Sequence, residues 1–431
     1  MNQRRRLLYL AYWVPPRNAI GTLRSVNVLK HLPKFGWDIT TVTAAVDPEE
    51  GRGSMIAPYV ETGYFDIKGS IKRLAGIRNG KPPAGLPART PNGVNKHGAL
   101  RRIATMLSSV VSYPDDYVGW LPYAVGTTRR LIARGGWDAM LTSAPPMTTN
   151  LIAALSHGSV PWIADLRDLW AENDSSERTM IQALFDNRLE RASLSRATAL
   201  TAASELSAAR FQRRFPGTPC FPIYNGFDAE EWQNVPFDRE SRCTFVYAGH
   251  LYSGKRDPTV LFAALRSILN DGLAAPEEVR VDFYTPHDSW VLQLIGAYRL
   301  EGIVEVQGFV DRAAVLAAER RANRLLVLSW DGPTAEGVVA GKLFEYFGAR
   351  RPVLAIGGPQ RFAVEDLLRE TGAGVRCRTV EETRAAILAA LNEHRSGGPR
   401  EIAESAVNDY RGDACAKRFA DVLDRALGAR V

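Results

Sequence analysis

Short apolar runs alternate with amphipathic segments along the whole chain, and this alternation constrains the fold more than any other feature. The rhythm is typical of a parallel sheet that is covered by helices on both faces. The first helix is predicted over 22–35, where Leu23, Val26, Leu29 and Leu32 recur at helical spacing. The strands predicted in the first half are 7–14, 39–43, 139–143, 162–165 and 199–202.

The same rhythm restarts after Tyr224–Asp228, where Asn225-Gly226 is a strong turn signal. The strands predicted in the second half are 244–248, 279–284, 304–309, 325–329 and 353–356. A chain of 431 residues is also too long for one ordinary domain. We therefore predict an α/β fold with two doubly wound, Rossmann-like domains, at 1–225 and 226–400, and a C-terminal helix at 401–431 that can pack back on the first domain.

Charge and cysteine content narrow the class of protein further. The net charge is +7, which favours anionic partners without choosing among them. Scattered cysteines at 220, 243, 377 and 415 predict neither a disulfide framework nor a zinc site, and they fit a reducing cytoplasm. No run approaches the roughly 18 apolar residues of a membrane span, and the apolar start of the chain reads as a buried strand rather than a signal peptide.

A basic excursion, over about 67–102, interrupts the rhythm. No acidic residue occurs between Asp66 and Asp115, while nine Lys or Arg residues gather at 68–102. Such a segment can touch anionic lipid headgroups or a phosphate-bearing acceptor. The alternative is a solvated loop.

Two strand-to-helix loops have the composition of phosphate sites. In the first, Gly21 allows a close backbone approach and precedes a helix N-terminus. The second, 249–256, has P-loop spacing, but Arg256 replaces the Ser or Thr that would hold magnesium. A P-loop kinase is therefore disfavoured, whereas Lys255 and Arg256 together suit a diphosphate. The alternative for both loops is an ordinary turn.

Two further segments carry carboxylates near predicted strand ends. Glu345 lies in a mainly apolar helix, where it could accept hydrogen bonds from both ribose hydroxyls. In 161–170, Asp165, Arg167 and Asp168 directly follow a strand, and Trp170 could stack on a sugar ring. The alternatives are a solvated helix face for Glu345 and a structural ion pair with a core tryptophan for 161–170.

In this order, the segments resemble the family 4 glycosyltransferases, whose fold is the two-domain GT-B type. The resemblance spans nearly the whole chain and is closest to bacterial members that build surface polysaccharides or exopolysaccharides. The matching segments are PPRNAIGTLRSVNVLKHLPKFGWDITTVT, LTSAPP, PWIADLRDLW, YNGFD, FVYAGHLYSGKRD, VEVQGFV and GKLFEYFGARRPVLA.

The resemblance implies that a nucleotide-diphosphate sugar binds in the cleft, mainly on the second domain. Lys255 resembles the family's diphosphate-binding lysine, and Glu345 resembles the second Glu of its E-x7-E motif, which binds the ribose. The residues assigned to donor binding are Gly21, Gly249, His250, Lys255, Arg256, Gly308, Phe309, Val310, Glu336, Lys342, Leu343 and Glu345. Those assigned to the acceptor side are Asp165, Arg167, Asp168 and Trp170.

The chain departs from the family pattern at two places. Position 337, where the first Glu of E-x7-E should stand, is Gly337, and Glu336 lies one residue early. A local insertion could let Glu336 supply the carboxylate, or that carboxylate is absent. No histidine follows the strand that ends at Ser143, although many members carry one near the donor sugar.

The resemblance also implies a retaining transfer without a protein nucleophile. Lys255 and Arg256 would stabilise the charge that grows on the leaving diphosphate. Asp165 or Asp168 could orient the acceptor hydroxyl, and we assign Asp168 to this role. No metal-binding motif is present, so we expect neither a metal nor a cofactor to be required, and UDP and GDP remain alternatives for the donor. The expected acceptor is a saccharide or a lipid-linked saccharide, met in the cytoplasm or at the inner face of the plasma membrane.

Other functions stay open or are disfavoured. A nucleotide-sugar epimerase can share the fold, and a non-catalytic nucleotide-sugar-binding protein fits the imperfect E-x7-E motif. A dinucleotide-dependent oxidoreductase is disfavoured because no G-x-G-x-x-G follows a predicted strand. Nucleic acid is not expected as a partner, since the basic residues are not interleaved with aromatics in a recognisable module.

Overall fold

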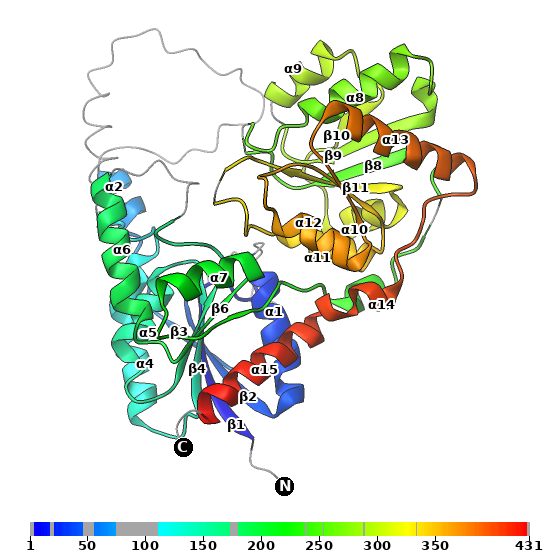
Figure 1. Ribbon diagram of the computed structural model, residues 1–431. Helices are drawn as coiled ribbons and strands as arrows, with labels where there is room; N and C mark the ends of the chain where they lie inside the picture. The colour runs from blue at the N-terminus through cyan, green and yellow to red at the C-terminus, as the bar shows by residue number, and fades with distance from the viewer. Residues whose placement is uncertain are drawn as a thin grey trace, which may run out of the picture.

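The computed structural model contains two parallel sheets, each in its own half of the chain (Figure 1). It describes residues 4–17, 21–45, 56–74, 111–172, 180–237, 239–252, 254–287, 289–332 and 334–428. All strand pairings given below are parallel, as the βαβ rhythm of the sequence predicts.

The first sheet has seven strands in the described residues, in the order β3-β2-β1-β4-β5-β6-β7. Its strands are β1 (Arg5–Ala11), β2 (Trp37–Ala44), β3 (Tyr59–Thr62), β4 (Ala139–Ala144), β5 (Trp162–Leu166), β6 (Ala199–Ala202) and β7 (Cys220–Pro222). Its helices are α1 (Thr22–His31), η1 (Leu32–Phe35), α2 (Ile67–Leu74), η3 (Val118–Trp120), α4 (Leu121–Ala133), α5 (Thr148–Ser156), α6 (Met180–Leu194) and α7 (Glu205–Arg214).

The second sheet has six strands in the part of the chain described, in the order β10-β9-β8-β11-β12-β13. Its strands are β8 (Cys243–Ala248), β9 (Val279–Tyr284), β10 (Val304–Val306), β11 (Arg324–Ser329), β12 (Val353–Gly357) and β13 (Gly374–Cys377). The accompanying helices are η4 (Ala229–Trp232), α8 (Thr259–Asn270), η5 (Pro276–Glu278), α9 (Ser289–Ala297), α10 (Arg312–Arg321), α11 (Gly341–Ala349), α12 (Ala363–Thr371) and α13 (Val380–Arg395).

Both faces of each sheet are buried. Successive side chains of a strand point to opposite faces, and both sets pack in apolar clusters. In β1, Leu8 and Leu10 pack in one apolar cluster, while Leu7 and Tyr9 pack in another. In β11, Leu326 and Leu328 belong to one cluster, and Leu325 and Val327 belong to the other. Each sheet is thus covered by helices on both sides, and the predicted pair of doubly wound parallel-sheet domains is confirmed.

The chain returns to the first domain at its end, through α14 (Glu404–Val407), η6 (Asn408–Tyr410) and α15 (Gly412–Gly428). In Figure 1, α15 lies along α1. Phe419 and Leu423 of α15 share an apolar cluster with Leu7 and Tyr9 of β1. The last helix therefore completes the core of the domain that begins the chain.

The two crossings between the domains run side by side. Phe227 forms a parallel bridge with Arg411, and the Gly412 amide donates to the Phe227 carbonyl at 2.8 Å. On the α1 side, Asn27 donates to the Gly226 carbonyl at 3.0 Å, and Lys30 forms an ion pair with Asp228 at 2.6 Å. The turn predicted from Asn225-Gly226 is thus anchored to the first helix.

The burial of α1 differs from the predicted stripe. Leu29 and Leu32 are buried, but so are Arg24, Asn27 and His31, which the sequence pattern places on a polar face. The cause is tertiary: α15 and the 225–228 crossing pack against α1, and the crossing supplies hydrogen-bond partners for Arg24 and Asn27.

The other predicted elements agree to within a few residues, apart from the C-terminal helix and three short strands that the prediction missed. The helix predicted at 401–431 is divided, and its long part, α15, begins only at Gly412. β3, β7 and β13 contain four, three and four residues, too few for a clear periodic signal. The strand predicted at 304–309 ends at Val306.

The basic segment lies mostly outside the described residues. Of its nine basic residues, Lys68 is described with its contacts: it belongs to α2 and pairs with Asp116. Among the helices that the structure describes, none is both long and apolar enough to cross a membrane.

Candidate functional site

The second sheet extends in two directions from β8: β9 and β10 lie on one side of it, and β11, β12 and β13 lie on the other. The loops after the neighbouring strands β8 and β11 therefore both leave the carboxyl edge of the sheet, but toward opposite faces. Ligands of open α/β sheets bind at such a switch point, beyond the carboxyl ends of the strands. The loop after β8, residues 249–258, carries the predicted phosphate-binding residues, and the loop after β11 leads into α11 with Lys342 and Glu345. The topology thus brings these two predicted segments together.

Gly249 begins the loop after β8 in a conformation that favours glycine, with φ +133°. A β-carbon at this position would lie 2.6 Å from Nζ of Lys342. Two parts of the chain nearly a hundred residues apart therefore meet here, and the absence of a side chain at Gly249 makes room for the amine of Lys342.

Lys342 holds its amine in an enclosed position. Its Nζ is buried, has no hydrogen-bond partner in the described part of the chain, and lies 3.7 Å from the ring centroid of Tyr247. Burial, followed by the neighbouring Arg256, lowers the pKa of Lys342 well below its ordinary value, whereas Glu319 and Glu345 act in the opposite direction.

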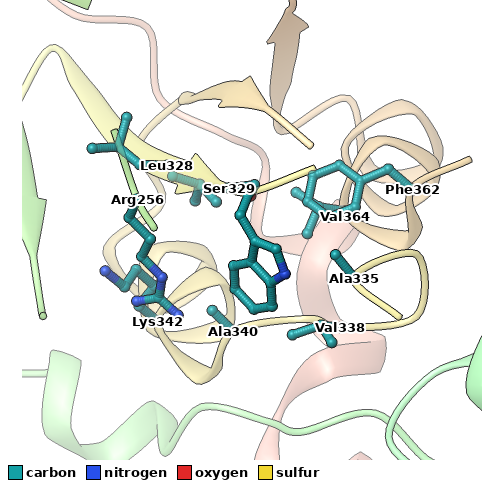
Figure 2. Close-up of a pocket in the computed structure, with 11 residues that line it drawn as sticks. Arg256, Leu328, Ser329, Ala335, Val338, Ala340, Lys342, Phe362 and Val364 are labelled. Atoms are coloured by element: carbon teal, nitrogen blue, oxygen red, sulfur yellow. The ribbon is translucent and has the colours of Figure 1, made fainter. Parts of the chain in front are cut away.

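Arg256 is the second cation at this place. Its Nη1 donates to the His250 carbonyl at 3.3 Å, and the guanidinium lies 4.9 Å from the Tyr252 ring centroid. Its Nε is buried without a partner among the described groups. Figure 2 shows the side chains of Arg256 and Lys342 next to each other at one end of a small pocket whose enclosed volume is about 10 Å³.

The other residues predicted in the 249–256 loop lie nearer to solvent. The side chains of His250 and Lys255 are exposed. The Lys255 amide donates to the Tyr252 carbonyl at 3.2 Å, which closes a tight turn whose Tyr252 has φ +51°. Leu343 is fully buried, so only its backbone could contact a donor.

Glu345 is largely buried and ion-paired. Its carboxylate accepts from Nη1 of Arg312 at 2.9 Å, and Arg312 also pairs with Glu231 at 2.7 Å. A ribose at this carboxylate would share it with Arg312. The sequence analysis did not identify Arg312 or Glu231, since only the fold brings α10 and η4 to α11.

Glu319 of α10 is a second residue that the sequence analysis missed. It is fully buried, and its carboxyl group adjoins that of Glu345. Burial, together with the charge of Glu345, raises the pKa of Glu319 well above its ordinary value. The sequence offered one signal for Glu319, a charged residue within the apolar stretch before β11. Such a residue is equally expected on a solvated face of a helix.

At position 337 the structure gives a reason for glycine. The Gly337 carbonyl accepts hydrogen bonds from Oγ of Ser204 at 2.7 Å and from Oγ of Ser207 at 3.3 Å, both at the start of α7 in the first domain. A β-carbon on Gly337 would lie 2.4 Å from Oγ of Ser207. A glutamate therefore does not fit here in this arrangement of the domains, while Glu336 is half-buried and accepts a hydrogen bond from the Ala363 amide with its backbone carbonyl.

The loop after β10 carries the residues predicted to meet the base. Gly308 has φ +72°, and a β-carbon there would lie 2.8 Å from Cε1 of His287. Phe309 is 80% exposed, with its ring centroid 6.0 Å from that of His250, and Val310 is exposed beside it. This loop and the phosphate loop are thus neighbours.

In the first domain, two predicted acceptor-side residues instead hold the loops together. Asp165 is buried and accepts from Arg24 at 2.6 Å and from Thr201 at 2.7 Å. Arg167 donates to the Gly21 carbonyl at 2.9 Å and also to the Pro145 carbonyl. Asp165 is therefore unavailable to an acceptor in this conformation, and Arg167 fixes the loop that ends at Gly21.

Trp170 and Asp168 differ in their access to a ligand. Trp170 is 2% exposed and donates to Asp186 at 3.2 Å, so its ring is a core residue and the stacking role predicted for it is wrong in this conformation. Asp168 is exposed. Burial in the surrounding protein raises the pKa of Asp168 above its ordinary value, although the charge of Arg167 acts in the opposite direction. Water reaches this carboxylate, and this limits the energetic cost of its charge.

The described residues include no group of three or more His, Cys, Asp or Glu side chains that could hold a metal ion. The ionisable groups at the switch point are instead two basic side chains, Lys342 and Arg256, on the phosphate-loop side and a carboxyl pair with Arg312 on the α10 side. That arrangement suits an anion next to a polar, hydroxyl-bearing group.

No family model matches the chain, and no curated protein matches it in sequence. Solved structures are similar over nearly its whole length. A sucrose-phosphate synthase from Thermosynechococcus elongatus is 14% identical, with 99% of this chain and 100% of that chain covered and a TM-score of 0.61. A glycosyltransferase from Rickettsia africae is 10% identical, with coverage of 98% and 99% and a TM-score of 0.61.

A third neighbour is an E. coli protein described as trehalose-6-phosphate bound with UDP-2-fluoro glucose. It is 10% identical, with 97% of this chain and 98% of that chain covered and a TM-score of 0.59. These similarities show the fold: the chain has the GT-B fold, as predicted.

Proposed function

We propose that this chain is a glycosyltransferase that binds a nucleotide-diphosphate sugar at the switch point of its second sheet. One observation carries the proposal: Nζ of Lys342 and Nε of Arg256 are both buried there without a partner in the described structure. Two neighbouring basic groups that are buried without hydrogen-bond partners are costly in a folded protein unless they serve an anion. A diphosphate, with two negative charges, matches that pair.

The remaining groups of the site fit the rest of such a donor. Lys255 would add a third cation from the solvent side, and Glu345 would accept hydrogen bonds from the ribose while Arg312 holds the carboxylate in place. The backbone at Gly308–Val310 and the exposed ring of Phe309 would meet the base. Gly21, at the facing edge of the first domain, would approach the phosphates as the domains close.

In the transfer we propose, the bond between the anomeric carbon and the diphosphate breaks with its electron pair on the diphosphate. The acceptor oxygen bonds to the same carbon, with retention, and its proton passes to a phosphate oxygen. Lys255, Arg256 and the loop amides stabilise the growing charge, which is the main contribution that the protein makes to the rate. Asp168, which is exposed, is the acceptor-side carboxylate that could orient the hydroxyl.

The proposal has further parts. We propose that the chain belongs to family 4, that its acceptor is a saccharide or a lipid-linked saccharide, and that it acts at the cytoplasmic face of the membrane. Its role would be in the biosynthesis of surface polysaccharide, exopolysaccharide or glycolipid. These parts rest on the motifs of the sequence. One neighbour's title names a bound UDP-sugar, and this favours UDP as the first nucleotide to test, with GDP as the alternative. The basic segment 68–102 is the part that we propose to contact anionic lipid.

The test is a thermal-shift screen over nucleoside diphosphates and their sugars, followed by product analysis with the nucleotide sugar that binds. We expect one base to raise the melting temperature, and nucleotide release to depend on an added acceptor. Conversion of the sugar without an acceptor would identify an epimerase. Binding without turnover would favour a non-catalytic protein, the alternative that Gly337 supports, and no binding by any nucleotide would refute the proposal.

A further inference from the structure

The amine of Lys342 lies in a buried position that is unfavourable for a lysine side chain without a partner. The side chain belongs to α11, yet its Nζ reaches beneath the loop after β8, next to the bare α-carbon of Gly249. Its contacts there are the face of the Tyr247 ring and the neighbouring Arg256, neither of which offers a counter-charge. An exposed lysine would instead keep its ammonium in water.

We propose that Lys342 is a concealed ligand of the nucleoside diphosphate, whose amine becomes charged by taking up a proton when the anion binds. The inference rests on the proposed nucleotide site and specifies how that site is regulated. The Nζ lies directly under the loop whose backbone and cations we assign to the diphosphate, and the buried Nε of Arg256 borders the same pocket.

The electrostatics of the free protein support a neutral amine. The groups that act on Lys342 are Arg256 from the phosphate loop, Tyr247 from β8, Glu319 from α10 and Glu345 from α11. Burial and Arg256 outweigh the two carboxyl groups, so the pKa of Lys342 is depressed. A bound diphosphate adds negative charge next to the amine, which shifts this pKa upward again.

The pocket as it stands, at about 10 Å³, holds roughly one water molecule and no phosphate. The anion must therefore bind from the cleft side of the loop, or the loop must move.

By linkage, a ligand that brings one proton with it binds more weakly as the pH rises. Above the lowered pKa of Lys342, the affinity for the nucleoside diphosphate should fall by up to about tenfold per pH unit. Between pH 7.5 and 8.5 the terminal phosphate of a free nucleoside diphosphate is ionised while its uracil or guanine ring is still neutral, so the ligand's own titration adds little to the slope.

The experiment is calorimetric titration of the whole protein with UDP, and with GDP if UDP does not bind, over pH 7.5 to 8.5, where the base of the nucleotide stays neutral. Each titration is repeated in two buffers of different ionisation enthalpy, which reports the protons taken up. We expect uptake approaching one proton per nucleotide in the wild type. Lys342→Met should abolish the uptake and weaken binding at least tenfold at pH 7.5.

Lys342→Arg and Lys417→Met complete the design. Arginine keeps its charge at every pH tested, so Lys342→Arg should bind without uptake and with a flat pH profile. Lys417, which pairs with Asp421 on the surface of α15, is the matched control, and its variant should behave like the wild type.

Nucleotide binding by the wild type without proton uptake would overturn this inference and leave the proposed function standing. If no nucleotide bound to the wild type, both would fail. The wild-type slope needs no variant, so the inference is tested even if a substitution at Lys342 prevents folding.

Discussion

Lys342 illustrates how a functional residue can be costly to the fold. Its buried amine has no partner in the described structure, and its pKa is lowered mainly by burial. We expect Lys342→Met to stabilise the nucleotide-free protein by about 1–3 kcal/mol near neutral pH, because it removes a desolvated polar group. Denaturant unfolding measures this gain, and a destabilised Lys342→Met protein would show that the amine has a structural partner after all.

Glu319 should make stability depend on pH. Because its pKa is raised above the ordinary 4.5, Glu319 loses its proton later in the folded protein than in the unfolded chain. Stability from this group is therefore present below about pH 4.5 and is lost as the pH rises toward the raised folded value. Glu319→Gln should be more stable than the wild type at pH 8, and this advantage should shrink at pH 5. Melting temperatures at the two pH values test the sign.

Substitutions at Asp165 and Asp168 should distinguish a carboxylate that stabilises the fold from one that is available to a ligand. Asp165→Asn leaves the buried Arg24 without its counter-charge, so we expect a loss of about 3–5 kcal/mol in the free energy of unfolding. Asp168→Asn is exposed and should change stability by less than about 0.5 kcal/mol. Equal losses in urea unfolding would contradict the distinction drawn between them.

At the scale of elements, the start of α7 and the loop after β11 form a contact between the domains. Gly337→Ala would place a methyl group against Ser207, at a cost of about 1–3 kcal/mol, and Ser207→Ala in the same chain should recover most of it. Thermal unfolding measures the cost, and the radius of gyration from solution scattering shows whether the domains separate. Gly126→Ala, on α4 with nothing within 4 Å of the added carbon, is the control.

The elements also show where sequence patterns were sufficient. Strands buried on both faces are rich in apolar and β-branched residues, so β4, β5, β8 and β9 could be predicted almost to the residue, although β9 contains Arg280 and Asp282. The polar face of α1 could not, since Arg24 finds its partners on β5 and on the 225–228 crossing, and Asn27 finds its partner on that crossing. Hydrophobic periodicity records which side chains avoid water and is silent on polar groups that are satisfied inside.

At the scale of the molecule, the end of the chain stabilises its beginning. Phe419 of α15 is 2% exposed and packs in the cluster that contains Leu7 of β1, beside the Arg24 guanidinium at 4.9 Å. We expect Phe419→Ala to cost about 3–5 kcal/mol and to lower the unfolding transition of the first domain. Hydrogen exchange resolved by segment is the measurement, and protection lost only in the second domain would contradict the assignment.

The sequence by itself determined the two parallel sheets, their order along the chain and the loops that leave the carboxyl ends of their strands, because these depend on local periodicity and turn residues. Only the tertiary structure decided which charged residues meet. It paired Arg312 with Glu345, seated Glu319 against the same carboxylate, turned Asp165 toward Arg24 and set the amine of Lys342 under Gly249. Charged side chains carry no periodic signal, and their protonation and partners follow from distance and burial, which arise only when remote segments pack together.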